Sequence, residues 1–272
     1  MSSTAVRRTA LAASAAALAL LVTACGGSSD DGGASGDDKA KAEQSAPAGG
    51  DKAGADESAP AGDALTAAEL EKIALAQADV KNGKVSTKIP ADEDIAEDQI
   101  STDDKACLPL ALAQTAVAPG EPGASVKRSW QGQTETLSKG SGPDGQDMTN
   151  ISVDMIRLNV ASYPGGGAEQ ALAELKTAAE QCAGGFVASV GSDKMRVAEV
   201  TTTAAPEGGD EGLAVTVGLD IGKEANAPMK LVVVRKGATV ASFAATNLSS
   251  MVSGADFEVP ADVVAAQVAK LG

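Results

Sequence analysis

The side chains that could do chemistry in this sequence are carboxylates, serines, lysines and three cysteines, because histidine is absent. Without histidine, the Ser-His-Asp and Cys-His mechanisms of nucleophilic catalysis are excluded. No serine is followed three positions later by lysine, which is the spacing that a Ser-Lys dyad needs. The clustered carboxylates of residues 92–98 lie in a polar run without an apolar pocket to raise a pKa. The sequence therefore predicts no catalytic set, and we expect that the protein is not an enzyme.

Cys25 follows directly on an apolar segment at the start of the chain. Arg7 and Arg8 precede the apolar residues 9–22, which is the layout of a secretory signal peptide. This core is shorter than the roughly 20 residues that a permanent transmembrane helix needs. Residues 21–25, Leu-Val-Thr-Ala-Cys, resemble the lipobox of bacterial lipoproteins. The resemblance implies that the signal peptide, residues 1–24, is removed and that Cys25 carries a lipid anchor of palmitate type at the cell membrane. The alternative is a plain secretory signal.

Residues 25–63 have the composition of a linker. After Cys25 they consist almost wholly of small, charged and turn-forming residues, with nine carboxylates against three lysines in 26–63. Such a stretch cannot bury enough apolar surface to offset its ordering entropy, so we expect a disordered acidic linker before one globular domain at 64–272. The whole chain has a formal net charge of −15, which argues against nucleic acid and anionic lipid as partners.

Two cysteines remain in the expected globular domain, Cys107 and Cys182. An even number of cysteines in an exported domain predicts a disulfide. The alternative is a pair of buried free thiols. A zinc site is not expected, because neither a histidine nor a third free cysteine completes the four ligands, and the sequence predicts no metal or other cofactor.

Periodicity and turn residues predict an α+β fold with a largely antiparallel sheet, packed helices and one disulfide. Thr66 and Glu69 form a capping box at the start of the first helix. Further helices are predicted at 108–115, at 168–182 and at 261–271, the last with Val264, Val268 and Leu271 on one face. Strands are predicted at 85–89, 125–136, 148–160, 195–203, 212–221, 230–234 and 239–247.

The order of these segments resembles a known family. The lipobox, the acidic linker, the first cysteine and the strand with Trp130 are followed by "ASYPGGGAEQALAELKTAAEQC", "LVVVRKGATVASFAATNL" and "VPADVVAAQVAKL". Together they resemble the PknH-type extracellular sensor-like domain of actinobacterial Ser/Thr kinases and lipoproteins, over about residues 64–272. The family often has two disulfides, whereas here one cysteine pair is present. The resemblance implies a ligand-binding or sensor-like role with no assigned catalytic residues.

We therefore expect an extracytoplasmic lipoprotein, held at the cell membrane by its N-terminal lipid, whose domain binds an envelope lipid or a wall fragment. The candidate ligand-binding residues are Arg128, Trp130, Arg157 and Tyr163, because arginine and aromatic side chains are favoured in recognition sites. Packing of Trp130 in the core is the alternative for that residue. The alternative function is a non-catalytic envelope scaffold that binds a protein partner through an exposed sheet edge. A large apolar cavity would favour the first function, and a long unpaired edge the second.

Overall fold

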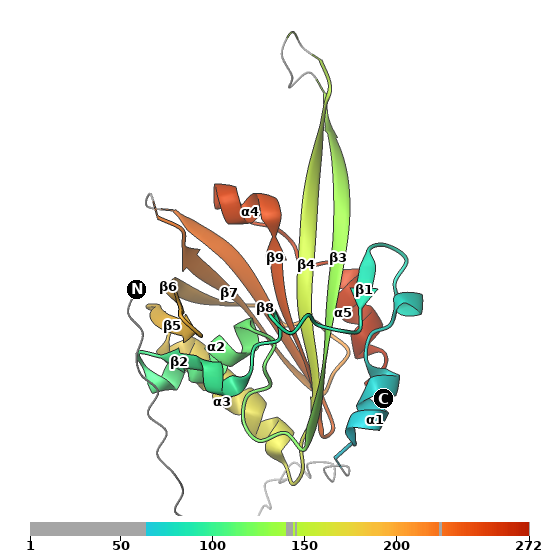
Figure 1. Cartoon of the computed structure of the whole chain (residues 1–272), viewed down its shortest axis with the longest axis vertical. Coiled ribbons are helices and arrows are strands. Elements are labelled where there is room, and N and C mark those ends of the chain that lie inside the picture. The colour runs from blue at the N-terminus through green and yellow to red at the C-terminus, as the bar shows by residue number, and fades with distance from the viewer. Residues whose placement is uncertain (1–63, 140–143, 145, 223–224, 272) are drawn as a thin grey trace, which may run out of the picture. The chain divides into compact units, whose positions relative to one another are not determined.

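The computed structural model describes residues 64–271 except 140–143, 145 and 223–224. The predicted signal peptide, Cys25 and the linker lie outside the described residues. Within these residues, nine strands form one antiparallel sheet in the order β1-β3-β4-β9-β8-β7-β6-β5-β2 (Figure 1). The predicted α+β fold with an antiparallel sheet is confirmed.

The β3–β4 hairpin is the longest feature of the sheet. The strands are β1 Lys84–Ser86, β2 Ile100–Thr102, β3 Ala124–Ser138, β4 Met148–Ser162, β5 Phe186–Val190, β6 Asp193–Thr203, β7 Glu211–Asp220, β8 Asn226–Lys236 and β9 Thr239–Asn247. β3 and β4 pair along their whole length, whereas β9 pairs only with residues 154–162 of β4. The outer half of the hairpin therefore projects beyond the sheet as a two-stranded arm (Figure 1).

Short helices cover both faces of the sheet. The α-helices are α1 Ala67–Ile73, α2 Leu108–Gln114, α3 Gly167–Gln181, α4 Leu248–Ser253 and α5 Ala261–Val268, with 3-10 turns η1 Gln77–Asp79, η2 Glu97–Gln99 and η3 Lys105–Cys107. α2 and α3 pack on one face, named here the α2–α3 face, in one apolar cluster. α1 and α5 pack on the other, the α1–α5 face, in a second cluster. Alternation along each strand sends successive side chains to these two cores.

The predicted disulfide is confirmed in the core of the α2–α3 face. Cys107 at the end of η3 is bonded to Cys182, which directly follows α3, with an S–S distance of 2.04 Å. Leu172 and Leu175 of α3, three positions apart on one side of the helix, are buried against the same core. The bridge thus fastens α2 and α3 together over the sheet.

The core of the α1–α5 face begins at the predicted capping box. The Thr66 amide donates to Glu69 Oε2 at 2.9 Å, and the Glu69 amide lies 3.4 Å from Thr66 Oγ1. These hydrogen bonds from Thr66 hold the pKa of Glu69 below its usual value. Val264, Val268 and Leu271 are buried in the same core, so the predicted apolar side of the last helix is also confirmed.

Several elements differ from the sequence predictions. β1 ends at Ser86, three residues before the predicted end, because it pairs with only three residues of β3. β8 extends to Asn226–Lys236, while β2, β5 and α4 were not predicted. The acidic run at 92–98, which the sequence shows only as a polar run, is held to the sheet at two points. Glu93 pairs with Arg157 at 3.1 Å, and Asp94 pairs with Lys127 at 2.7 Å.

Candidate functional site

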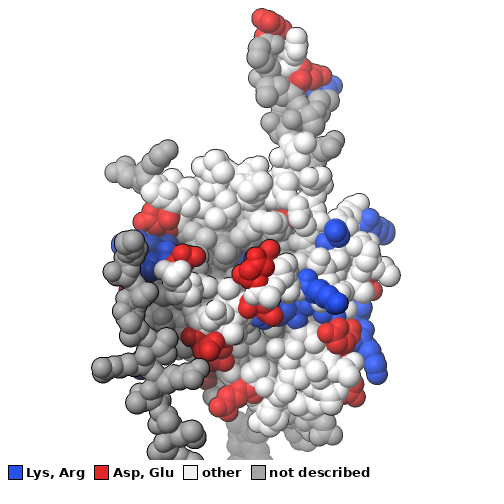
Figure 2. All heavy atoms as spheres, viewed as in Figure 1, with Lys and Arg blue, Asp and Glu red and all other residues white. Residues whose placement is uncertain are grey.

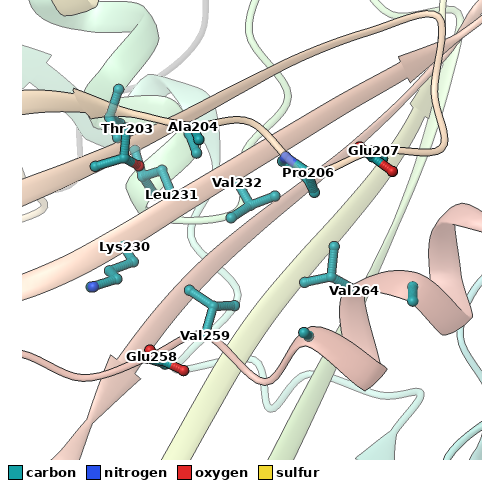
Figure 3. Close-up of a pocket in the computed structure, with 14 residues that line it drawn as sticks. Thr203, Ala204, Pro206, Glu207, Lys230, Leu231, Val232, Glu258, Val259 and Val264 are labelled. Atoms are coloured by element: carbon teal, nitrogen blue, oxygen red, sulfur yellow. The ribbon is translucent and has the colours of Figure 1, made fainter.

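A pocket of about 500 Å³ lies on the α1–α5 face between β6, β7, β8 and α5, and is named here the α5 pocket (Figure 3). Val232 of β8, Val259 of the connecting segment and Val264 of α5 surround the space (Figure 3). Its lining consists of Thr203, Ala204, Pro206, Glu207, Ala214, Val215, Lys230, Leu231, Val232, Glu258, Val259, Ala261, Val264 and Ala265. Most of these side chains are small and apolar.

The pocket exists because β7 carries large side chains on one face and small ones on the other. Its residues on the α2–α3 face are Leu213, Val215, Val217 and Leu219, and those on the α1–α5 face are Gly212, Ala214, Thr216 and Gly218. On the opposite wall, Ala261 and Ala265 stand one turn apart on α5 and are both exposed. Small residues on both walls leave the intervening space empty.

Charged side chains stand at the rim of the α5 pocket. Lys230 Nζ lies 2.8 Å from an Asp256 carboxylate oxygen and 5.5 Å from the centre of the Phe257 ring. The hydrogen bond from Lys230 holds the pKa of Asp256 below its usual value. Glu207 and Glu258 are exposed and, within the described residues, belong to no ion pair. With Lys230 neutralised by Asp256, the rim carries an excess of negative charge.

A second pocket, of about 490 Å³, lies on the α2–α3 face beside the end of α2 and is named here the methionine pocket. Its lining consists of Glu93, Gln114, Thr115, Ser129, Trp130, Gln131, Met155, Ile156, Arg157, Met195, Met229, Ala244 and Thr246. The side chains of Trp130 and Ile156 belong to the core on the other side of the sheet. Three methionines from three strands therefore provide most of its apolar wall.

Arg128 and Trp130, two of the predicted ligand-binding residues, lie buried on the α1–α5 face. Arg128 is 4% exposed and forms a salt bridge with Glu71 of α1, while its Nε donates to the Leu75 carbonyl at 3.3 Å. The Trp130 indole donates to the Asn82 carbonyl at 3.0 Å and is 5% exposed. Arg128 thus fastens α1 to β3. Trp130 packs in the core, which was the alternative expected for this residue.

The other two predicted residues lie apart from that pair. Tyr163 is 1% exposed, its hydroxyl donates to the Pro119 carbonyl at 2.9 Å, and burial raises its pKa. The Arg157 side chain is 41% exposed at the mouth of the methionine pocket, where it binds Glu93. The four side chains do not converge on one site, and none of them lines the α5 pocket.

The residues that shape the α5 pocket escaped the sequence analysis. The strand expected at 212–221 carries large side chains at alternate positions, whereas the pocket depends on the small side chains between them. That alternation of large and small residues is the signal from which an uncovered, hollow sheet face could have been predicted.

The described residues contain no group of three or more Asp, Glu, Cys or His side chains arranged to hold a metal ion. In the same part of the chain, no helix has the length and the apolar character needed to cross a membrane.

The comparisons with known proteins find likeness among solved structures alone, and the one described here is weak. No protein-family model matches this chain, and no curated protein sequence matches it. Among solved structures, the chain is similar to the crystal structure of the extracellular domain of PknH from Mycobacterium tuberculosis. The sequence identity is 14% and the TM-score 0.29, over 68% of this chain and 96% of that chain. A likeness of this degree says nothing about the ligand of this protein.

Proposed function

We propose that this protein is a non-catalytic, membrane-tethered, extracytoplasmic ligand-binding module, and that the α5 pocket holds a small amphipathic envelope molecule. The α5 pocket carries this proposal. Its volume of about 500 Å³ lies within the range of roughly 300–1,000 Å³ that is usual for small-molecule sites. Apolar walls with a few polar groups at one side are likewise typical of such sites.

The charges at the rim select the polar end of the ligand. Lys230 is already neutralised by Asp256, whereas Glu207 and Glu258 stand exposed beside the apolar walls. An anionic head group would meet these carboxylates at short range and be repelled. The ligand therefore has an apolar body and a neutral or cationic head.

The proposed location rests on the cysteines. The Cys107–Cys182 disulfide is typical of proteins in an oxidising compartment outside the cytoplasm. The signal-like segment before Cys25 adds the proposed lipid anchor. A flexible chain of the length of the acidic linker spans on the order of 35 Å, which would let the domain reach ligands near the membrane surface.

The test uses three probes with the same decyl chain: decyltrimethylammonium, decyl maltoside and decanoate. They are titrated below micelle formation into the full chain, purified with Cys25 unmodified and the disulfide formed, and binding is measured by calorimetry. We expect the cationic and neutral probes to bind at least tenfold more tightly than decanoate. Equal or tighter binding of decanoate would contradict the proposed selection by charge.

A matched pair of variants locates the binding. Ala265→Phe fills the α5 pocket from an exposed helix position and should abolish binding of all three probes while the stability of the domain stays unchanged. Ala173→Phe makes the same change at an exposed position of α3, on the other face, and should bind as the wild type does. If Ala265→Phe binds normally, the α5 pocket is not the site.

The alternative function, a scaffold for a protein partner, is favoured by two features around the arm. Within the described residues, β3 beyond Gln131 pairs only with β4, so its outer edge has free backbone groups. Ile151 of the arm and Leu248 and Val252 of α4 are 56%, 54% and 80% exposed. Figure 2 shows an uncharged surface where α4 lies beside the arm.

A photo-crosslinking residue at Val252, compared with the same residue at Ala173, tests the scaffold in cells. A single protein captured from position 252 alone, and lost when Ile151 is changed to Asp, would favour the scaffold. No specific product would leave the ligand-binding module as the function.

A further inference from the structure

Gln114 at the end of α2 is a buried polar side chain without a hydrogen-bond partner. It is 3% exposed, and within the described residues neither its amide nitrogen nor its amide oxygen has a partner. A carboxamide offers two donors and an acceptor, and burying them unpaired lowers the free energy of unfolding. Leucine would suit this helix position without that penalty. Gln114 is therefore a position where the fold is less stable than it could be.

Gln114 also lines the methionine pocket, and a second partnerless carboxamide lies on the same sheet face. Asn159 of β4 is 1% exposed and stands two residues along the strand from Arg157, which is part of the pocket lining. Residues two apart on a strand point to the same face. Gln114 thus places an unpaired carboxamide, closed off from solvent in the free domain, beside this pocket, and Asn159 places a second one on the same face of the sheet.

Methionines make the apolar part of the pocket. Met155, Met195 and Met229 come from β4, β6 and β8, and they are half of the six methionines in the chain. Thioether side chains adapt to the shape of a ligand and make favourable contacts with aromatic ring edges. These walls therefore suit a flat, apolar ring.

The mouth of the methionine pocket carries balanced charge. Arg157 Nη1 donates to the Glu93 carbonyl and Nη2 to a Glu93 carboxylate oxygen, both at 3.1 Å. This pair neutralises both side chains and ties Glu93 to Arg157 beside the pocket. An uncharged ligand therefore fits this site better than an ion.

We propose that the methionine pocket is a second ligand site, independent of the α5 pocket, for an uncharged aromatic molecule with an amide-type edge, in which N–H and C=O are adjacent. When the Gln114 side chain turns into the pocket, such an edge pairs with its carboxamide through two parallel hydrogen bonds, as glutamine pairs with the edge of adenine in protein–DNA complexes. The ring then lies among the three methionines. Bound ligand supplies the partners that Gln114 lacks in the free domain.

The experiment uses the full chain with isotope-labelled methionine methyl groups, which gives separate resonances for the methionines of the pocket and those outside it. The probes are carbostyril, a flat bicyclic ring with an amide edge, and N-methylcarbostyril, in which the N–H donor is blocked. We expect carbostyril to shift the resonances of Met155, Met195 and Met229 in a saturable way. N-methylcarbostyril should bind about tenfold more weakly, because one hydrogen bond to Gln114 is lost.

Gln114→Leu separates a ligand-binding role from a structural one. Without ligand, this variant should melt a few degrees above the wild type, because an unpaired buried amide has been replaced by an apolar side chain of similar size. It should also bind both probes with equal, weak affinity. Gln170→Leu makes the same change at an exposed position of α3, and there both the melting temperature and the preference for carbostyril should stay as in the wild type.

Three results would overturn the proposal. One is equal affinity of the wild type for the two probes, and another is a shift limited to Met148 or Met251. The third is a lower melting temperature of Gln114→Leu, which would show that Gln114 has a partner in the free fold. Since these outcomes do not involve the α5 pocket, they leave the proposed function untouched.

Discussion

Gln267 is the side chain whose replacement tests most directly how the α1–α5 face is held together. It is fully buried in α5, where its amide nitrogen donates to the Ile73 carbonyl at 2.9 Å and its amide oxygen accepts from the Leu75 amide at 2.7 Å. Both partners lie at the end of α1 and directly after it, more than 190 residues away along the chain. Gln267 thus joins α5, a wall of the α5 pocket, to α1.

Gln267→Leu keeps the size of the side chain but removes both hydrogen bonds. The Leu75 amide would then be buried and unpaired, since Leu75 is 1% exposed, which costs about 1–3 kcal/mol. Ile73 is partly exposed to water, so loss of the hydrogen bond to its carbonyl adds only about 1 kcal/mol. We expect a total loss of about 2–4 kcal/mol in the free energy of unfolding, or a drop of roughly 10 °C in melting temperature for a domain of this size.

The assay is urea unfolding followed by the fluorescence of Trp130, the single tryptophan of the chain, which is buried on the same face. The midpoint should fall without a change in the slope of free energy against urea. Gln170→Leu is the control, because that exposed side chain only bonds Glu174 on its own helix; its effect should stay within about 0.5 kcal/mol. A loss below about 1 kcal/mol for Gln267→Leu would refute the reasoning, because it would mean that the Leu75 amide finds another partner.

Three further perturbations test other parts of the fold. Replacing Cys107 and Cys182 by alanine opens a loop with a sequence separation of 75 and should lower the free energy of unfolding by about 4 kcal/mol in urea titrations. Burial raises the pKa of Tyr163 in the folded domain above the value near 10 that it has in the unfolded chain. Its contribution to stability is therefore present below pH 10 and is lost as the pH rises through the pKa of the folded state. Ultraviolet absorbance should show that this single tyrosine ionises only when the domain unfolds in alkali. The hydrogen bond from Lys270 lowers the pKa of Asp79 in the folded domain. The Asp79 carboxylate therefore contributes to stability above its unfolded pKa, near 3.8, and this contribution is lost as the pH falls through its folded pKa. In Lys270→Met, the free energy of unfolding should consequently fall less steeply as the pH is lowered.

Controls and contrary outcomes accompany each of these tests. In Lys194→Met, at an exposed position of β6, the free energy of unfolding should fall at acid pH as it does in the wild type. If Lys270→Met shows the same acid dependence of stability as the wild type, the ion pair between Lys270 and Asp79 is not formed in solution. Ionisation of Tyr163 near pH 10 in a folded domain would contradict its burial. A loss below about 1 kcal/mol in the double alanine variant would argue that the loop is already constrained without the bridge.

Features encoded by neighbouring residues could be predicted from the sequence. The capping box of Thr66 and Glu69 and the apolar side of the last helix each depend on a few neighbouring positions. The disulfide followed from the number of cysteines. α4 was missed although it has local signals, the Asn247 cap and the left-handed Gly254 at its end, because six residues are too few to show a helical period.

The candidate site was harder to predict, because a strand pattern shows which residues share a face but not what covers that face. Arg128 and Trp130 stand two positions apart on one strand and so share a face, yet α1 covers them, through Glu71 and the segment after the helix. Gln114 gives no signal in the sequence, since a glutamine at a helix end is ordinarily exposed. It is buried on a helix that packs against β8 and β9, which are distant in the chain.

The α5 pocket follows from a mismatch between a wide sheet and a short helix. Nine strands make a sheet about 40 Å wide, whereas α5, with eight residues, is only about 12 Å long. α1 and α5 therefore leave β6 and β7 uncovered on their face. Over β6 this face is polar, with Glu199, Thr201 and Thr203 exposed, as is normal for a sheet face that meets water, whereas beside α5 the lining is Ala214 of β7 with valine and alanine on the adjoining wall. Apolar lining without a covering element is what a bound apolar molecule would explain, and Ala265→Phe is the substitution that decides between a ligand site and a mere gap in the packing.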